Sequence, residues 1–205
     1  LLATGDHKAV NKMHEMSFLI YNLVIFPMMA GILIVNDDFV QFFLGQDFQD
    51  ARYAIAIMIF RMFFIGWTNI MGIQILIPHN RNKEFMISTT APAIISVGLN
   101  LLFLPKLGYI GAAIVSVLTE ALVWAIQLYF TRRYLKEVPI IGSMTKIILA
   151  SAIMYGILLG SKTVIHFSPT LNVLVFAVLG GIIYLFAILS MKVVDVKELK
   201  QIIKK

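Results

Sequence analysis

Long apolar segments constrain this chain more than any other feature. Each of six runs is near the ~20 residues that a helix needs to cross ~30 Å of hydrocarbon. None of them alternates apolar and polar residues as the strands of a membrane barrel do. We therefore predict an all-α, polytopic membrane protein with about six transmembrane helices: Ser17 to Asn36, Tyr53 to Ile77, Phe85 to Leu104, Tyr109 to Phe130, Ile140 to Ser161 and Leu171 to Met191.

The composition agrees with a lipid environment and the charges indicate an orientation. Hydrophobic residues make up 60% of the 205, charged residues only 14%, and the mean hydropathy is +0.88. With these six spans, thirteen of the 17 basic residues lie on the same side of the membrane as the N-terminus. Arg52, Lys106 and Lys162 lie on the other side, and Arg61 lies within a span. Cytoplasmic loops are rich in Lys and Arg, so both termini are expected in the cytoplasm. The net charge of +6 comes from these topology signals, and no nucleic-acid partner is expected.

The chain divides into four regions by composition. Residues 1–16 are expected to be a cytoplasmic lead-in, and 17–130 to be the four-helix part of a C-terminal transport lobe. Residues 131–191 lack a polar stripe and are expected to be an accessory helix pair. Residues 192–205 predict a basic amphipathic tail on the inner leaflet, or simply a solvated tail. Because the chain opens without an initiator Met, we expect the C-terminal part of a longer transporter or channel.

Three consecutive spans carry polar residues at helical spacing. Such residues face one another or a watery cavity, because lipid leaves their polar groups unpaired. The alternative is interhelical hydrogen bonding that only holds the bundle together, at ~0.6 kcal/mol per contact. The candidate residues are Arg61, Thr68 and Asn69 in the second span, Thr89, Ser96 and Asn100 in the third, and Ser116, Glu120 and Gln127 in the fourth.

Arg61 and Glu120 are the charged residues deepest in the predicted spans. At ~1.5 Å per residue from the outer ends, Arg61 lies ~12 Å deep and Glu120 ~17 Å deep, a difference that an Arg side chain can bridge. One interpretation is a closed ion pair that fixes helix register. The other is a cation presented to a phosphate, with Glu120 as its resting counter-ion or as a proton or cation site.

Two prolines interrupt predicted helices. Pro27 removes the hydrogen bond to the Leu23 carbonyl, and Pro92 removes the one to the Ser88 carbonyl. Neighbouring helices can satisfy freed carbonyls, so tolerated packing is one interpretation. The other is that Pro27 and Pro92 are hinges of a transport cycle.

Enzyme chemistry finds little support in the sequence. His7 and His14 stand near acidic residues, but no ligand spacing recurs, and a solvated cytosolic segment is expected there instead of a metal site. No phosphate-cradling Gly loop is present in the sequence. We expect neither an enzyme nor a cofactor.

Four segments, in order, resemble the C-terminal half of the polysaccharide biosynthesis flippases of the multidrug/oligosaccharidyl-lipid/polysaccharide exporter superfamily. They are FPMMAGILIV, FFLGQDFQDARYA, GIQILIPHNRNKEFM and NLLFLPKLGYIGAAIVSVLTEALV. The last is the most specific, with Asn100, Pro105, Gly108, Gly111 and Glu120 on the family's pattern. Leu107 departs from the pattern, because the family often has an aromatic residue directly before the glycine that corresponds to Gly108.

The resemblance implies a two-lobed bundle around a central cavity in a bacterial plasma membrane. It implies a substrate as well: a lipid-linked oligosaccharide, the undecaprenyl-pyrophosphate repeat unit of capsule, exopolysaccharide or O-antigen. Expected partners are the N-terminal lobe, membrane lipids and a coupling ion, H+ or Na+. Arg61 is expected at the pyrophosphate with Glu120 as its counter-ion, and the sugars are expected at Thr68, Asn69, Ser96, Asn100 and Gln127. A multidrug or cation exporter of the same superfamily, and a non-transporting membrane scaffold, remain as alternatives.

Overall fold

The computed structural model describes residues 6–164 and 167–193, apart from the side chain of His7, and their regular structure is helical. Most of the predicted tail therefore lies outside the described residues. In chain order the helices are α1 (His7–Phe43), the short 3-10 turn η2 (Gln46–Phe48), α2 (Ala51–Asn69), the π-helix η3 (Ile70–Leu76), α3 (Asn82–Leu135), α4 (Ile140–Lys162) and α5 (Pro169–Ser190). The prediction of an all-α chain is confirmed.

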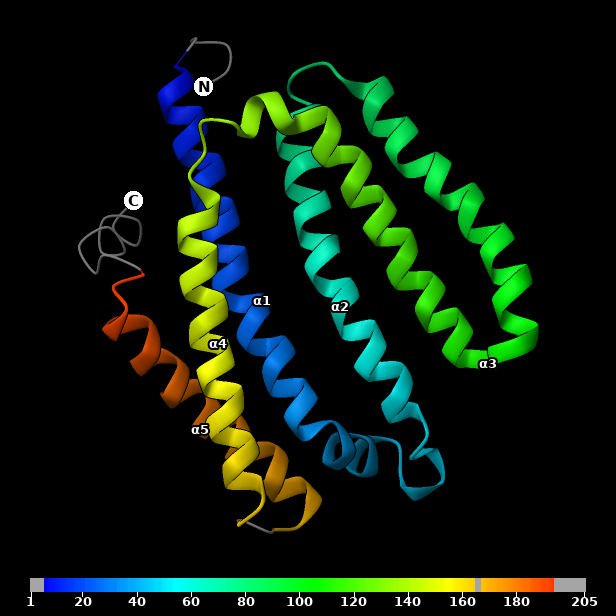
Figure 1. Ribbon diagram of the computed structural model, residues 1–205, viewed down its shortest axis with the longest axis vertical. Helices are drawn as coiled ribbons and strands as arrows, with labels where there is room; N and C mark the ends of the chain where they lie inside the picture. Colours follow the sequence, from blue (N-terminus) through cyan, green and yellow to red (C-terminus); the bar gives the residue numbers. More distant parts are fainter. Residues whose placement is uncertain (1–5, 165–166, 194–205) are drawn as a thin grey trace. The chain divides into compact units, whose positions relative to one another are not determined.

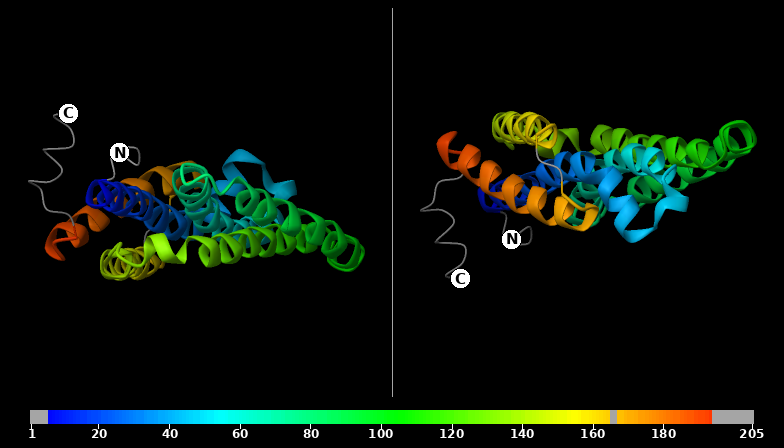
Figure 2. Two further views of the ribbon diagram at one scale, coloured as in Figure 1. Left: turned by 90° about the horizontal axis from the view of Figure 1, so that it is seen from above. Right: turned by 90° about the horizontal axis from the view of Figure 1, so that it is seen from below.

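Five of these helices are long and apolar enough to cross a membrane, if α2 and its continuation η3 are counted as one helix. The predicted third and fourth spans both lie in α3, whose 54 residues would extend over ~80 Å if straight. The backbone leaves the helical region at Gly108, where φ is 55° and ψ is −137°. This conformation is open to glycine and closed to nearly every other residue. Figure 1 shows the result, a hairpin of two arms, and the turn between the arms is seen again in Figure 2.

The chain forms two compact units. The first contains the chain up to Tyr21 together with Asp50–Ile140, and the second contains Asn22–Gln49 together with the chain from Ile141 on. The boundary therefore falls within α1, whose second part belongs with α4 and α5. On sequence alone the whole first span was expected to belong with the second to fourth spans.

In the first unit, the beginning of α1 packs on α2. Phe18 is fully buried, and its ring centroid lies 4.7 Å from that of Trp67. The Ser17 hydroxyl donates to Oε1 of Gln74 over 2.8 Å. The Tyr21 hydroxyl donates to the Met62 carbonyl. Helical structure begins at His7, so α1 starts ten residues before the predicted span.

In the second unit, a polar network ties α1 to α4 and α5. Nζ of Lys162 lies 3.0 Å from Oδ2 of Asp38 and donates to the Ile34 carbonyl over 2.6 Å. Nδ2 of Asn172 donates to Oδ1 of Asp38 over 2.8 Å. Asp38, with its side chain only 13% exposed, therefore connects three helices. Along α4, before the network at Lys162, the buried apolar residues are Ile147, Ala150, Met154 and Leu158.

Candidate functional site

The two charges that the sequence places deepest in the spans are in contact. Nη2 of Arg61 lies 2.9 Å from Oε1 of Glu120, and Nε of Arg61 lies 3.3 Å from the same oxygen. Arg61 is on α2 and Glu120 on the second arm of α3. This confirms the prediction that the Arg61 side chain is long enough to bridge the difference in depth between Arg61 and Glu120. Both contacts use a single carboxylate oxygen, which differs from the paired, two-oxygen geometry in which Arg binds carboxylates most strongly.

This ion pair is partly exposed at the surface of the unit. The side chain of Arg61 is 38% exposed and that of Glu120 is 19% exposed. A guanidinium carries five N–H donors, and the contacts with Glu120 engage two of its three nitrogens. The cation can therefore take an anionic ligand in addition to, or in place of, its counter-ion.

One helical turn after Glu120, an aromatic cluster fills the space between α2 and the second arm of α3. Trp124 lies 6.3 Å from Phe63, 5.8 Å from Phe64 and 6.3 Å from Trp67, measured between ring centroids. Trp67 is 7% exposed. The cluster forms a rigid apolar wall beside the Arg61–Glu120 pair, and rings of this kind also offer a stacking surface for a ligand.

Gln127 lies one turn further along the same face and is 1% exposed. Its Nε2 donates to the Ser88 hydroxyl over 3.2 Å, which joins the two arms of α3. The predicted polar face of the fourth span therefore points toward the interior of the unit at Gln127. Ser88, its partner, was not among the predicted residues. The signal was available, because Ser88 precedes Pro92 by one turn and Ser96 by two.

The other predicted residues bond mainly within their own helices. Thr68 Oγ1 and Asn69 Nδ2 both donate to the Ile65 carbonyl over 2.9 Å. Asn100 Nδ2 donates to the Ser96 carbonyl over 2.9 Å and lies 3.4 Å from the Ser96 hydroxyl. The structure thus brings together Arg61 with Glu120, and Ser96 with Asn100, but it does not join all seven residues in one hydrogen-bonded site.

The π-helix η3 begins directly after Asn69. It continues α2 through Ile70–Leu76 with wider turns, closed for example by the 3.1 Å bond from the Ile77 amide to the Gly72 carbonyl. π-turns inside helices are rare and frequent at functional sites. This widening was not predicted, because its composition is that of any apolar helical segment.

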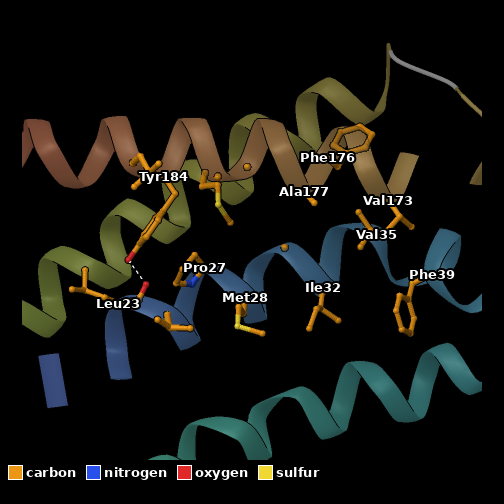
Figure 3. Close-up of a pocket in the computed structure, with 16 residues that line it drawn as sticks. Leu23, Pro27, Met28, Ile32, Val35, Phe39, Val173, Phe176, Ala177 and Tyr184 are labelled. Carbon is orange, nitrogen blue, oxygen red and sulfur yellow. Dashed lines mark hydrogen bonds between the residues drawn. The ribbon is translucent and has the colours of Figure 1, made fainter. Parts of the chain in front are cut away.

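In the second unit, the carbonyl freed by Pro27 has a partner. The Tyr184 hydroxyl of α5 donates to the Leu23 carbonyl over 2.8 Å, as drawn in Figure 3. Beside this bond lies an apolar groove of about 580 Å³, lined by α1, α4 and α5. Figure 3 shows Pro27, Met28 and Ile32 of α1 along one side of it. Pro92 lies in α3, where non-helical backbone is recorded only at Gly108 among the described residues. The hinge roles of Pro27 and Pro92 stay predictions.

Replacing Tyr184 by Phe should lower the free energy of unfolding by ~0.5–1.5 kcal/mol, because the Leu23 carbonyl then loses its partner. The loss should vanish in a Pro27→Ala background, since the amide of Ala at 27 can bond to that carbonyl. Unfolding in detergent micelles measures both values. An equal loss in the two backgrounds would show that the bond acts independently of the proline.

The fold and the apolar helices together define a multi-pass α-helical membrane protein. Among curated proteins, an uncharacterized membrane protein of Methanocaldococcus jannaschii is 25% identical over 201 residues, which are 98% of this chain and 39% of that protein. A protein of Escherichia coli (strain K12) described as "Putative O-antigen transporter" is 33% identical over 89 residues, which are 43% of this chain and 21% of that protein. The matched residues therefore cover 39% of the length of the first protein and 21% of the length of the second.

No protein-family model matches the chain. No solved structure matches it either. The similarity that remains is distant, and in the case of the Escherichia coli protein it is also partial.

Proposed function

We propose that this chain is the C-terminal part of a transporter that flips undecaprenyl-pyrophosphate-linked oligosaccharide repeat units across the plasma membrane, for capsule, exopolysaccharide or O-antigen synthesis. The observation that carries the proposal is the partly exposed Arg61–Glu120 pair between two helices of membrane-spanning length. The partial similarity to the O-antigen transporter supports the same class of cargo.

The pair suits this task because a charge within the membrane is costly without a partner. An unpaired Arg at the bilayer centre costs at least ~2.5–3.5 kcal/mol on insertion scales. Glu120 stabilises Arg61 while the site is empty. A pyrophosphate entering the site offers Arg61 stronger, two-oxygen contacts and displaces Glu120. The released carboxylate can then take up the coupling ion, H+ or Na+.

In this proposal the sugars are held by neutral groups on α2 and on the first arm of α3. Ser96 and Asn100 on the first arm of α3, and Thr68 and Asn69 on α2, exchange their local hydrogen bonds for bonds to sugar hydroxyls. Gln127, which is buried, orients the two arms of α3 through Ser88 and meets the substrate only if that bond opens. The N-terminal lobe of the same protein supplies the opposite wall of the cavity.

Deletion of the gene in its own host tests the function. Lipid-linked repeat units should then accumulate in the inner leaflet while surface polysaccharide is lost, and re-expression of the full protein should reverse both effects. Normal surface polysaccharide in the deletion strain, with no second transporter of this kind in the genome, would overturn the proposal.

A hydrated substrate path also makes a prediction for thiol labelling. This chain has no Cys, so Ser96→Cys introduces the single thiol of this chain, and any Cys of the N-terminal lobe is replaced by Ser beforehand. The Ser96→Cys variant should react with a water-soluble thiol reagent at least about tenfold faster than a Leu101→Cys variant on the same arm. Leu101 is 73% exposed, and an exposed apolar residue on a membrane helix faces lipid. Equal, slow labelling of both variants would favour a dry scaffold.

A further inference from the structure

A polar pocket lies at one end of the first unit, away from the Arg61–Glu120 pair. It has a volume of about 470 Å³ and is lined by residues from three segments: Lys8, Asn11 and His14 of α1, His79 of the α2–α3 connection, and Arg133 and Glu137 at and after the end of α3. Figure 1 shows that the beginning of α1, the α2–α3 connection and the end of α3 lie at the same end of the unit. None of these residues belongs to the proposed transport site.

His14 is the most informative residue of the pocket. The sequence suggested a solvated histidine, but its helix begins at His7 and its side chain is only 1% exposed. Both ring nitrogens, Nδ1 and Nε2, are buried and have no hydrogen-bond partner. Buried polar atoms in native proteins are nearly always satisfied, so an unsatisfied imidazole lining a cavity points to a ligand.

Three other residues that line the pocket contact one another: His79, Arg133 and Tyr134. Nδ1 of His79 lies 2.7 Å from the Ile75 carbonyl, so it carries the proton, and its ring centroid lies 4.0 Å from that of Tyr134. The guanidinium of Arg133 lies 4.6 Å from the centroid of the Tyr134 ring and donates to the Tyr134 hydroxyl. Tyr134 therefore contacts both the Arg133 guanidinium and the His79 imidazole of the pocket lining.

The charges of the pocket favour an anion. Lys8 and Arg133 are cationic, and Glu137 is the one acidic side chain among the described residues that line it. Glu137 already accepts a hydrogen bond from Nδ2 of Asn11 over 3.1 Å. Within the described part of the chain, no three His, Cys, Asp or Glu residues are grouped so as to hold a metal ion.

We propose that this pocket is a second ligand site, which binds a phosphate group through Lys8, Arg133 and His14. Lys and Arg donate charge-assisted hydrogen bonds to phosphate oxygens, and the His14 ring, which lines the pocket, offers an N–H that has no other partner. The cationic residues place this end on the cytoplasmic side by the positive-inside rule. The phosphate is either the head group of an anionic lipid in that leaflet or a soluble phosphate. The site does not depend on the transported substrate.

Two probes on the full protein in phosphatidylcholine nanodiscs distinguish the sources. Inorganic phosphate is titrated by calorimetry, and retention of phosphatidic acid, mixed into the nanodiscs, is measured by native mass spectrometry. At least one probe should bind the wild type. Its affinity should fall at least about tenfold in Arg133→Gln and in His14→Phe, because each removes a direct contact. Binding of phosphatidic acid alone identifies a lipid head group, and binding of inorganic phosphate identifies a soluble ligand.

The neighbouring Arg132→Gln variant is the matched control, because Arg132 is exposed, lies over the Tyr129 ring and does not line the pocket. It should keep wild-type affinity. If His14→Phe does not fold, Lys8→Gln with Arg133→Gln carries the test. The proposal is overturned if neither probe binds the wild type, or if Arg132→Gln weakens binding as much as Arg133→Gln does.

Discussion

Replacing Arg61 by Ala should reduce surface polysaccharide at least about tenfold in cells that depend on the full protein, a loss of ~1.4 kcal/mol or more in the transport step. Two effects act in the same direction. On the proposed function, the pyrophosphate loses its cation within the membrane, and Glu120 becomes a carboxylate without a partner in the same low-dielectric region. Surface glycan and inner-leaflet intermediates, normalised to the amount of protein in the membrane, measure the effect.

The matched control is Arg132→Ala, which removes an exposed Arg from the end of the same unit and should leave transport unchanged. The double variant Arg61→Met with Glu120→Met separates the two interpretations of the pair. A purely structural ion pair tolerates replacement by apolar residues of similar volume, so that variant would fold and transport. A substrate site cannot tolerate it. Normal transport in Arg61→Ala or in the double variant would exclude the binding role of Arg61.

The contact between Arg61 and Glu120 could be predicted because the depth of each residue in the membrane follows from regular helix geometry. Helical rise gives the depth of each residue, and an isolated charge in an apolar span needs a partner. The carbonyl freed by Pro27 was predictable for the same reason, since a proline always lacks the same N–H. Its partner, Tyr184, was not predictable, because 161 residues separate it from Leu23 and only the packing of α5 on α1 brings the two together.

Three other features could not be predicted from the sequence, because they also depend on contacts between distant residues. Burial of His14 depends on His79 and on the end of α3, both far away along the chain. The division of α1 between two units depends on which neighbours each part packs against. The π-helix after Asn69 has the same apolar pattern as an α-helix. In each case local propensity is satisfied by several arrangements, and tertiary packing selects one.

Replacing Gly66 by Ala should lower the free energy of unfolding by ~2–4 kcal/mol, the sum of overpacking and of one lost hydrogen bond. A methyl group at Gly66 would overlap the ring of Tyr21, which crosses α2 at this position. The ring must move away, and its hydroxyl then leaves the Met62 carbonyl. Unfolding of the full protein in detergent micelles measures the loss.

Two further variants make this prediction specific to the crossing of α1 and α2. Gly98→Ala, inside α3, meets nothing within 4 Å, so it should be neutral or raise the free energy of unfolding by up to ~1 kcal/mol through helix propensity. In a Tyr21→Ala background the obstructing ring is absent, and Gly66→Ala should then cost almost nothing. If Gly66→Ala is equally harmful with and without Tyr21, overlap with that ring is not the source of the loss.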